Sequence, residues 1–205
     1  MLLYLSSNKF GQNTEFLQDW IKKHNNKLLL IINALDTKDE AKIKNIIQED
    51  VALLEEIGFE VKIIDLKYYF NKAEELKNDF SNYNTYCVVG GNVFILRQAM
   101  KLSGLDEFLK SLSSNDNYLY IGYSAGSCVL ANDLRILDRV DEPIAFYDSN
   151  NVIYEGLGLI DFIFIPHYKS NYHKVHLIDE IVQVCEKDNI KFKAVKDGEV
   201  IIYNN

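Results

Sequence analysis

The sequence predicts a three-layer α/β/α sandwich built around a mostly parallel sheet. Short apolar runs alternate along the chain with longer stretches of helical periodicity, and only two prolines occur among 205 residues, without a linker-like or low-complexity segment. Strands that alternate with helices form parallel sheets whose two faces the helices cover. A chain of this length can bury about 70% of its unfolded surface. We therefore expect a single domain spanning residues 1–205, with ligands at the carboxyl ends of the strands.

The first half of the chain contains the clearest alternation. Apolar runs of four or five residues are too short for a buried helix and predict strands. In order, we expect a strand at Leu2–Leu5, a helix around Glu15–Lys23, a strand at Leu28–Ile32, a helix at Asp39–Ile57 and a strand at Glu60–Leu66. The second helix has apolar residues at spacings of three and four, as on the buried face of an amphipathic helix. Gly58 is the expected end of that helix.

The second half continues the pattern, with glycine turns between strands and helices. We expect strands at Tyr86–Val89, Tyr118–Tyr123 and Phe162–Ile165, and helices at Val93–Leu102, Asp106–Leu112, Ala125–Asn132 and His176–Lys187. Two further apolar runs, Phe192–Val195 and Val200–Tyr203, flank Lys196-Asp197-Gly198. An Asp-Gly turn between two such runs predicts a terminal β-hairpin.

Charge and cysteine content exclude several classes of protein. The net charge is −8 and no basic block is present, which argues against a nucleic-acid partner. Cys87, Cys128 and Cys185 form no CxxC pair, so we expect buried free thiols rather than disulfides or a zinc site. No basic leader precedes the first apolar run, and no run approaches the ~20 residues that span a membrane. These features predict a cytoplasmic protein without a membrane partner, either a monomer or a homodimer.

The strongest motif is Gly122-Tyr123-Ser124-Ala125-Gly126, which lies between a predicted strand and a predicted helix. A sharp strand-to-helix turn of the GxSxG type lifts a serine hydroxyl out of the sheet and makes it a candidate nucleophile. The amide of Ala125, at the start of the helix, would then face a developing oxyanion. The alternative is a tight turn that carries an incidental serine.

A second glycine turn, Gly90-Gly91-Asn92, also joins a strand to a helix. Backbone amides in such a turn can supply a second oxyanion donor or bind a phosphate. No Gly-Lys-Ser/Thr sequence follows, so the turn is not a phosphate-binding P-loop. Ordinary glycines of a strand-to-helix connection are the alternative interpretation.

A nucleophilic serine needs a base, which is most often a histidine. Of the four histidines, His167 follows a buried strand and Pro166, at the strand end where active sites collect, whereas His24, His173 and His176 lie in polar segments. An acid must orient the imidazole. Asp197, in the terminal turn, and Asp141, in an acidic loop, are both candidates.

These motifs, in this order, resemble those of the peptidase E family of serine peptidases. The matching segments are Gly-Gly-Asn-Val-Phe at 90–94, Gly-Tyr-Ser-Ala-Gly-Ser at 122–127, Ile-Pro-His-Tyr at 165–168 and Asp-Gly at 197–198. The family includes aspartyl dipeptidases and is related to cyanophycinases. The resemblance implies a flavodoxin-like fold akin to class I glutamine amidotransferase domains.

The resemblance also implies site residues. Ser124 corresponds to the nucleophile, His167 to the base and Asp197 to the late acid, while Gly91 and Ala125 correspond to the oxyanion hole. The late acid of the family is usually Glu, and an aspartate at the position of Asp141 has also been treated as catalytically important. An arginine-bearing stretch that would recognise an N-terminal aspartate is missing after His167. Lys169 and Lys174 are the local cations, but a lysine does not reproduce a bidentate guanidinium contact.

The sequence therefore predicts a serine peptidase that hydrolyses small peptides through an acyl-enzyme on Ser124, a dipeptidase with Asp-X substrates as one option. No metal or organic cofactor is required, and the substrate-binding residues stay unassigned. One alternative is an esterase of the α/β-hydrolase type, whose order of serine, acid and histidine would select Asp141. The other is a non-catalytic, amidotransferase-like module that binds a metabolite.

Overall fold

The computed structural model describes residues 1–147 and 151–204. Its main sheet has six strands in the order β3-β2-β4-β5-β1-β8, and the first five of these are mutually parallel. The last strand, β8, runs antiparallel to β1 at the edge of the sheet. The strands are β1 Leu2–Ser6, β2 Lys27–Ile31, β3 Glu60–Ile64, β4 Thr85–Val88, β5 Leu119–Tyr123 and β8 Val200–Asn204.

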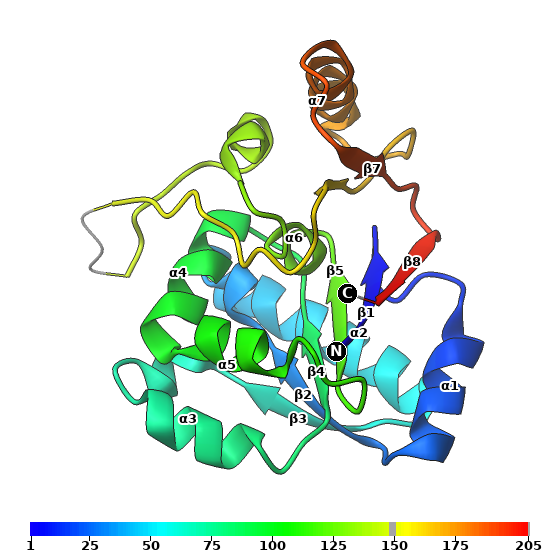
Figure 1. Ribbon diagram of the computed structural model, residues 1–205, viewed down its shortest axis with the longest axis vertical. Coiled ribbons are helices and arrows are strands. Elements are labelled where there is room, and N and C mark those ends of the chain that lie inside the picture. Colours follow the sequence, from blue (N-terminus) through cyan, green and yellow to red (C-terminus); the bar gives the residue numbers. More distant parts are fainter. Residues whose placement is uncertain (148–150, 205) are drawn as a thin grey trace.

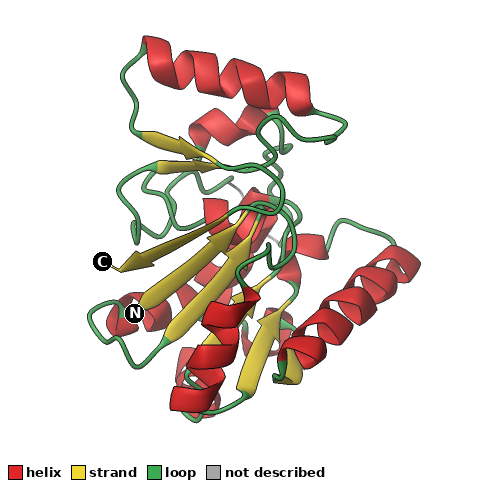
Figure 2. Cartoon of the chain, turned by 90° about the vertical axis from the view of Figure 1, so that its right-hand side faces the viewer, coloured by secondary structure: helices red, strands yellow, loops and turns green. Residues whose placement is uncertain are grey.

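Helices cover both faces of this sheet (Figures 1 and 2). Helix α1 packs on α2, whereas α4 packs on α5 and on the short α6. The helices are α1 Thr14–Lys23, α2 Glu40–Ile57, α3 Ala73–Phe80, α4 Val93–Ser103, α5 Leu105–Leu112, α6 Ala125–Cys128 and α7 Val175–Lys187, with 3-10 helices η1 Asn33–Leu35, η2 Leu66–Tyr69 and η3 Arg135–Arg139. This architecture confirms the predicted three-layer α/β/α fold. No helix in the described part of the chain is long and apolar enough to cross a membrane.

Local sequence explains where the best-defined helices begin and end. The Asp39 side chain accepts a hydrogen bond from the Lys42 amide and caps α2. Gly58 adopts the left-handed conformation, at φ 119°, and ends α2 as predicted. Asn92 caps α4, because its side chain accepts from the amides of Phe94 and Ile95. The last residue of the glycine turn 90–92 is therefore the N-cap of α4, which fixes the turn at the start of that helix.

A second, two-stranded sheet stands apart from the main one and carries α7 (Figure 1). Its strands are β6 Ile163–Ile165 and β7 Phe192–Ala194, which pair in parallel with Ile165 opposite Ala194. Parallel strands cannot be joined by a tight turn and need a crossover, which α7 supplies here. The result is a small βαβ unit at one end of the molecule.

The predicted terminal hairpin is wrong. The turn does form, since the Glu199 amide bonds to the Lys196 carbonyl and Gly198 has φ 92°. Its two strands, however, belong to different sheets: β7 pairs with β6, and β8 pairs with β1. By pairing with β1, β8 satisfies backbone groups that would otherwise form an open edge of the central sheet.

Two helices also differ from the prediction. The helix expected at Ala125–Asn132 ends at Cys128, because the next three carbonyls accept hydrogen bonds from the 157–159 segment instead of continuing the helix. Helix α3 at Ala73–Phe80 was not predicted. Only Leu76 and Phe80 of that helix are buried, so its apolar pattern is too sparse to be recognised.

Candidate active site

The register of the main sheet brings three predicted segments to one edge. Ser6 pairs with Tyr123 between β1 and β5, and Val88 pairs with Gly122 between β4 and β5. Ser7, Ser124 and the 90–92 turn therefore emerge together where the strands end. This is the carboxyl edge of a parallel sheet, where ligands of open α/β folds bind.

Ser124 occupies a strained turn of the kind that the GxSxG motif predicts. Its backbone has φ 48° and ψ −117°, a conformation that costs a non-glycine residue about 1–3 kcal/mol. A Cβ on Gly122 would lie 2.6 Å from the Gly126 carbonyl oxygen, and one on Gly126 would lie 2.2 Å from the Val88 carbonyl oxygen. Both glycines are therefore required for β5 to turn into α6 so closely against β4.

His167 and Asp197 reach Ser124 from the βαβ unit. Because Ile165 lies opposite Ala194, the residues that follow both strands leave the small sheet at the same edge. His167 Nε2 lies 3.3 Å from Ser124 Oγ, and its Nδ1 lies 2.9 Å from Asp197 Oδ1. The three side chains thus form a continuous hydroxyl–imidazole–carboxylate chain. This arrangement lets an imidazole accept the serine proton while the acid holds the other ring nitrogen.

Ser7 contacts both partners of this chain and was not predicted. Its buried hydroxyl donates to Asp197 Oδ1 over 2.6 Å and accepts the backbone amide of His167 over 2.7 Å. The ring of Tyr172 stacks on the imidazole ring of His167, with centroids 4.4 Å apart and an interplanar angle of 20°. The sequence held one signal for Ser7, namely its position directly after a buried strand.

The two predicted oxyanion residues flank Ser124. The amides of Ser127 and Cys128 donate to the Ser124 carbonyl, which begins α6. The Ala125 amide lies in the first turn of this helix, where amides have no hydrogen-bond partner within the helix. A Cβ on Gly90 would lie 3.0 Å from Ser124 Cβ, so the glycine turn packs directly on the Ser124 turn. Gly91 has φ 152°, and a Cβ there would lie 2.1 Å from the Ala34 carbonyl oxygen. The roles of Gly91 and Ala125 as oxyanion donors stay predictions.

Asp141, the other candidate acid, occupies a different position. Its Oδ2 accepts the Val93 amide over 2.8 Å, whereas the imidazole nitrogen Nδ1 of His167 faces Asp197. Burial raises the pKa of Asp141 to about 6, although the Val93 hydrogen bond and the charges of Lys174 and Lys38 oppose this rise. Of the two acids, the structure therefore brings Asp197 to the imidazole.

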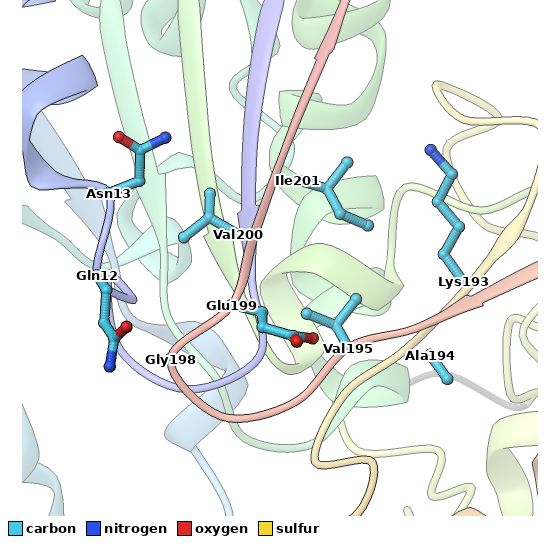
Figure 3. A pocket seen from close by; sticks show the side chains of 9 residues that line it. All are labelled: Gln12, Asn13, Lys193, Ala194, Val195, Gly198, Glu199, Val200 and Ile201. Atoms are coloured by element: carbon cyan, nitrogen blue, oxygen red, sulfur yellow. The ribbon is translucent and has the colours of Figure 1, made fainter.

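A cavity of about 600 Å³ opens over these groups. Its walls include two of the catalytic candidates, the glycine turn, Asp141, Tyr172 and three lysines, namely Gly90, Gly91, Asn92, Ser124, Asp141, His167, Tyr172, Lys9, Lys38 and Lys174. Lys9 is held by ion pairs with Glu49 and the buried Asp50. A separate hollow of about 710 Å³ lies between residues of β7 and β8 (Figure 3), and none of the Ser124, His167 and Asp197 side chains lines it.

The cysteines lie in the interior. All three are free and buried, as predicted. Burial raises the pKa of the Cys128 thiol well above its ordinary value, and its Sγ donates to the Phe164 carbonyl over 3.4 Å. Cys128 is therefore not poised as a displaced nucleophile. Within residues 1–147 and 151–204, no group of three or more histidine, cysteine or acidic side chains is placed to hold a metal ion.

Comparison with known proteins gives a consistent result. The family model described as peptidase family S51 matches residues 2–205. Uncharacterized peptidase Lin0382 of Listeria innocua serovar 6a is 35% identical over 127 residues, which are 62% of this chain and 56% of the relative. Uncharacterized peptidase Lmo0363 of Listeria monocytogenes serovar 1/2a is 34% identical over 95 residues, 46% of this chain and 42% of the relative. The chain thus spans about half the length of the curated relatives it matches.

Two solved structures share the fold. A protein from Listeria monocytogenes EGD-e, described as a peptidase E protein, superposes with a TM-score of 0.77 at 21% identity, covering 100% of this chain and 98% of that one. A peptidase from an acI-B1 actinobacterium superposes with a TM-score of 0.69 at 16% identity, covering 99% of this chain and 83% of that one. At these identities the likeness shows a common fold.

Proposed function

Because the chain belongs to peptidase family S51, we propose that it is a serine peptidase that cleaves small peptides, and specifically a dipeptidase, with Ser124 as its nucleophile. The observation that carries this proposal is the contact chain from Ser124 Oγ through the His167 imidazole to Asp197 Oδ1. The strained Ser124 turn and the adjoining glycine turn support it further.

The proposed reaction proceeds through an acyl-enzyme. Ser124 Oγ attacks the scissile carbonyl carbon while His167 Nε2 takes its proton, and Asp197 accepts a hydrogen bond from Nδ1. The amides of Gly91 and Ala125 stabilise the oxyanion. His167 then protonates the leaving amine. In the second half of the reaction, His167 takes a proton from a water molecule that attacks the acyl-enzyme ester, and it returns this proton to Ser124 Oγ as the acid product leaves.

The size and charge of the cavity support a small peptide substrate. A volume of about 600 Å³ suits a molecule with two or three residues. For an acidic side chain, Lys174 is the better placed of the two lysines near His167, because it lines the cavity. Lys169 does not line it, and its ammonium lies over the Tyr168 ring, 5.0 Å from the centroid. Preference for Asp-X is therefore proposed with Lys174 as the point charge.

The nucleophile is tested by Ser124→Ala, with Ser111→Ala on α5 as the matched control. We expect Ser124→Ala to lower the hydrolysis of a dipeptide panel (Asp-X, Glu-X, Lys-X and neutral-X) by at least about 10⁴-fold, because the acyl-enzyme cannot form. A fluorophosphonate should label wild type and Ser111→Ala at Ser124, but not Ser124→Ala. Undiminished hydrolysis by Ser124→Ala would contradict the proposal.

Substrate panels and labelling together separate the alternatives. The esterase hypothesis selected Asp141 as the acid, whereas His167 Nδ1 lies 2.9 Å from Asp197. A panel of acyl esters beside the dipeptides compares the two activities directly. A non-catalytic binding module predicts that native protein leaves the fluorophosphonate unreacted.

A further inference from the structure

Asp141 has no part in the proposed reaction, yet it lines the wall next to the nucleophile. Together with Ser124, Ala125, His167 and Tyr172, it surrounds a pocket that opens beside the main cavity. The rest of that pocket is largely apolar, formed by Cys128, Leu137, Val140, Pro166 and Ile178. A carboxylate in such a place is costly unless a cation pairs with it.

One oxygen of this carboxylate is free to bind a ligand. Oδ2 accepts the Val93 amide over 2.8 Å. Among the described residues, Oδ1 contacts no hydrogen-bond donor, and no fully buried side-chain oxygen lacks a partner, so Oδ1 must be accessible. Asp141 lines both cavities beside Ser124. The protein supplies no ion pair either: Lys174 donates to the Val140 carbonyl over 2.6 Å, and Lys38 is exposed.

The position of Asp141 relative to the glycine turn defines which substrate group it can meet. Val93, its backbone partner, comes two residues after Gly91. A substrate carbonyl whose oxygen faces Gly91 and Ala125 therefore lies close to Asp141. In a peptide cleaved after its first residue, the α-amino nitrogen is two bonds from the scissile carbonyl carbon. That nitrogen must lie beside the oxyanion hole, next to this carboxylate.

The size of the pocket excludes a long cationic side chain. Its free volume is about 30 Å³, which is room for a group the size of an ammonium or a water molecule. A lysine or arginine side chain at this position would not fit. The free α-ammonium of a peptide is small and is held at a fixed distance from the scissile carbonyl.

We propose that Asp141 binds the free α-ammonium group of the substrate and thereby positions the first carbonyl of the peptide at Ser124. This inference rests on the proposed function, because it assigns a subsite beside Ser124. The ion pair also fixes which carbonyl faces the nucleophile, since a carbonyl farther along the peptide would leave the ammonium away from Asp141. Blocking the amine removes both the charge and the fit.

The test compares a dipeptide that the wild type cleaves with its N-acetyl derivative, in the wild type, in Asp141→Asn and in Glu142→Gln. Glu142 is the exposed acid next in the chain, which lines the same cavity. We expect the wild type to prefer the free amine by about 100-fold or more in kcat/KM. Asp141→Asn should lose that preference, through a fall in activity on the free dipeptide alone, whereas Glu142→Gln should keep it.

Fluorophosphonate labelling separates failure of this inference from failure of the proposed function. Labelling at Ser124 together with equal cleavage of free and acetylated peptides would overturn the ammonium subsite and leave the serine peptidase intact. Retention of the preference by folded Asp141→Asn would also overturn it. If Asp141→Asn failed to fold, equal cleavage of the two peptides by the wild type would still overturn the inference. Absence of labelling and of cleavage would overturn both proposals.

Discussion

At the scale of single residues, Ser7 contacts the two residues that we propose activate Ser124. Its hydroxyl donates to Asp197 and accepts from the His167 amide, so one buried group sets the position of both. The backbone of His167 has φ 61°, an uncommon conformation for a side chain of this kind, and the Ser7 contact helps to hold it.

Ser7→Ala should therefore lower kcat by about 10- to 100-fold, because a shift of an ångström in the imidazole suffices for such a loss. KM should change little, since Ser7 is buried and does not line the cavity. Steady-state kinetics of the variant measure both parameters. Ser103→Ala removes another buried serine hydroxyl, on α4, and should leave kcat unchanged. A rise in KM with constant kcat for Ser7→Ala would speak for a substrate contact instead.

The site could be predicted from sequence where one residue type at one strand end carries the chemistry. Ser124 and His167 follow buried strands, and those positions singled them out. The choice between Asp197 and Asp141 could not be made, because it depends on which strands pair. Ser7 was missed for a related reason. A serine after a strand looks like a turn residue until a partner 190 positions away is placed beside it.

At the scale of elements, a buried carboxylate joins α2 to β5, the strand that leads into Ser124. Asp50, in the middle of α2, accepts hydrogen bonds from the Tyr123 hydroxyl over 2.7 Å and from Lys9 Nζ over 2.8 Å. The Tyr123 ring also packs on Gly90, where a Cβ would lie 2.7 Å from it. The end of β5, the glycine turn and the loop after β1 thus meet at one charged group.

Tyr123→Phe should lower the free energy of unfolding by about 2–3 kcal/mol, because it leaves a buried carboxylate with one donor fewer. Urea denaturation measures the loss. Tyr86→Phe is the control, since the Tyr86 hydroxyl bonds to the neutral carbonyls of Phe80 and Tyr83 and its removal should cost about 1 kcal/mol. Asp50→Asn combined with Tyr123→Phe should restore part of the loss. Purely additive effects of the two changes would contradict the proposed coupling.

Element types were easier to predict than their partners. Every strand in the main sheet was expected within a few residues, and the buried parallel strands were the clearest because they are nearly continuous apolar runs. The mistaken hairpin had the right strands and the right turn. Local sequence cannot distinguish two runs that pair with each other from two runs that pair with β6 and β1, because both arrangements use the same apolar runs and the same turn.

At the scale of the whole molecule, the α/β alternation predicted the three layers, but not the separate βαβ unit. That unit delivers His167 and Asp197 to a sheet that supplies Ser7, Ser124 and the glycine turn. The proposed reaction therefore requires the two sheets to keep a fixed position relative to each other. The buried groups of the site should then affect the free energy of unfolding of the whole domain. For Asp141 this effect can be measured.

Burial raises the pKa of Asp141 to about 6, above its ordinary value of 3.8, so the folded protein holds this proton more tightly than the unfolded chain. The stability that the protonated Asp141 contributes to the folded state is fully present below about pH 4 and is lost as pH rises through 6. The difference corresponds to about 3 kcal/mol, and to about 2 kcal/mol once partial exposure of the side chain is allowed for. Asp141→Asn should therefore be more stable than the wild type by about 2 kcal/mol at pH 8, with the difference closing toward pH 4.

Urea denaturation of both proteins at pH 4, 5, 6, 7 and 8 measures this difference, and Glu142→Gln should follow the wild type throughout. The raised pKa of Asp50 contributes equally to both proteins and cancels. A gap that does not change with pH would mean that the Asp141 charge is not responsible. If the difference in stability closes toward pH 4 as expected, Asp141→Asn is more stable than the wild type at high pH. We also expect this variant to lose recognition of the substrate amine, and such a trade-off is typical of a binding group that is charged in an apolar pocket. A peptide ammonium bound beside Asp141 would lower its pKa again, so the same pH series with a non-cleavable dipeptide analogue should stabilise the wild type more than the variant at pH 8.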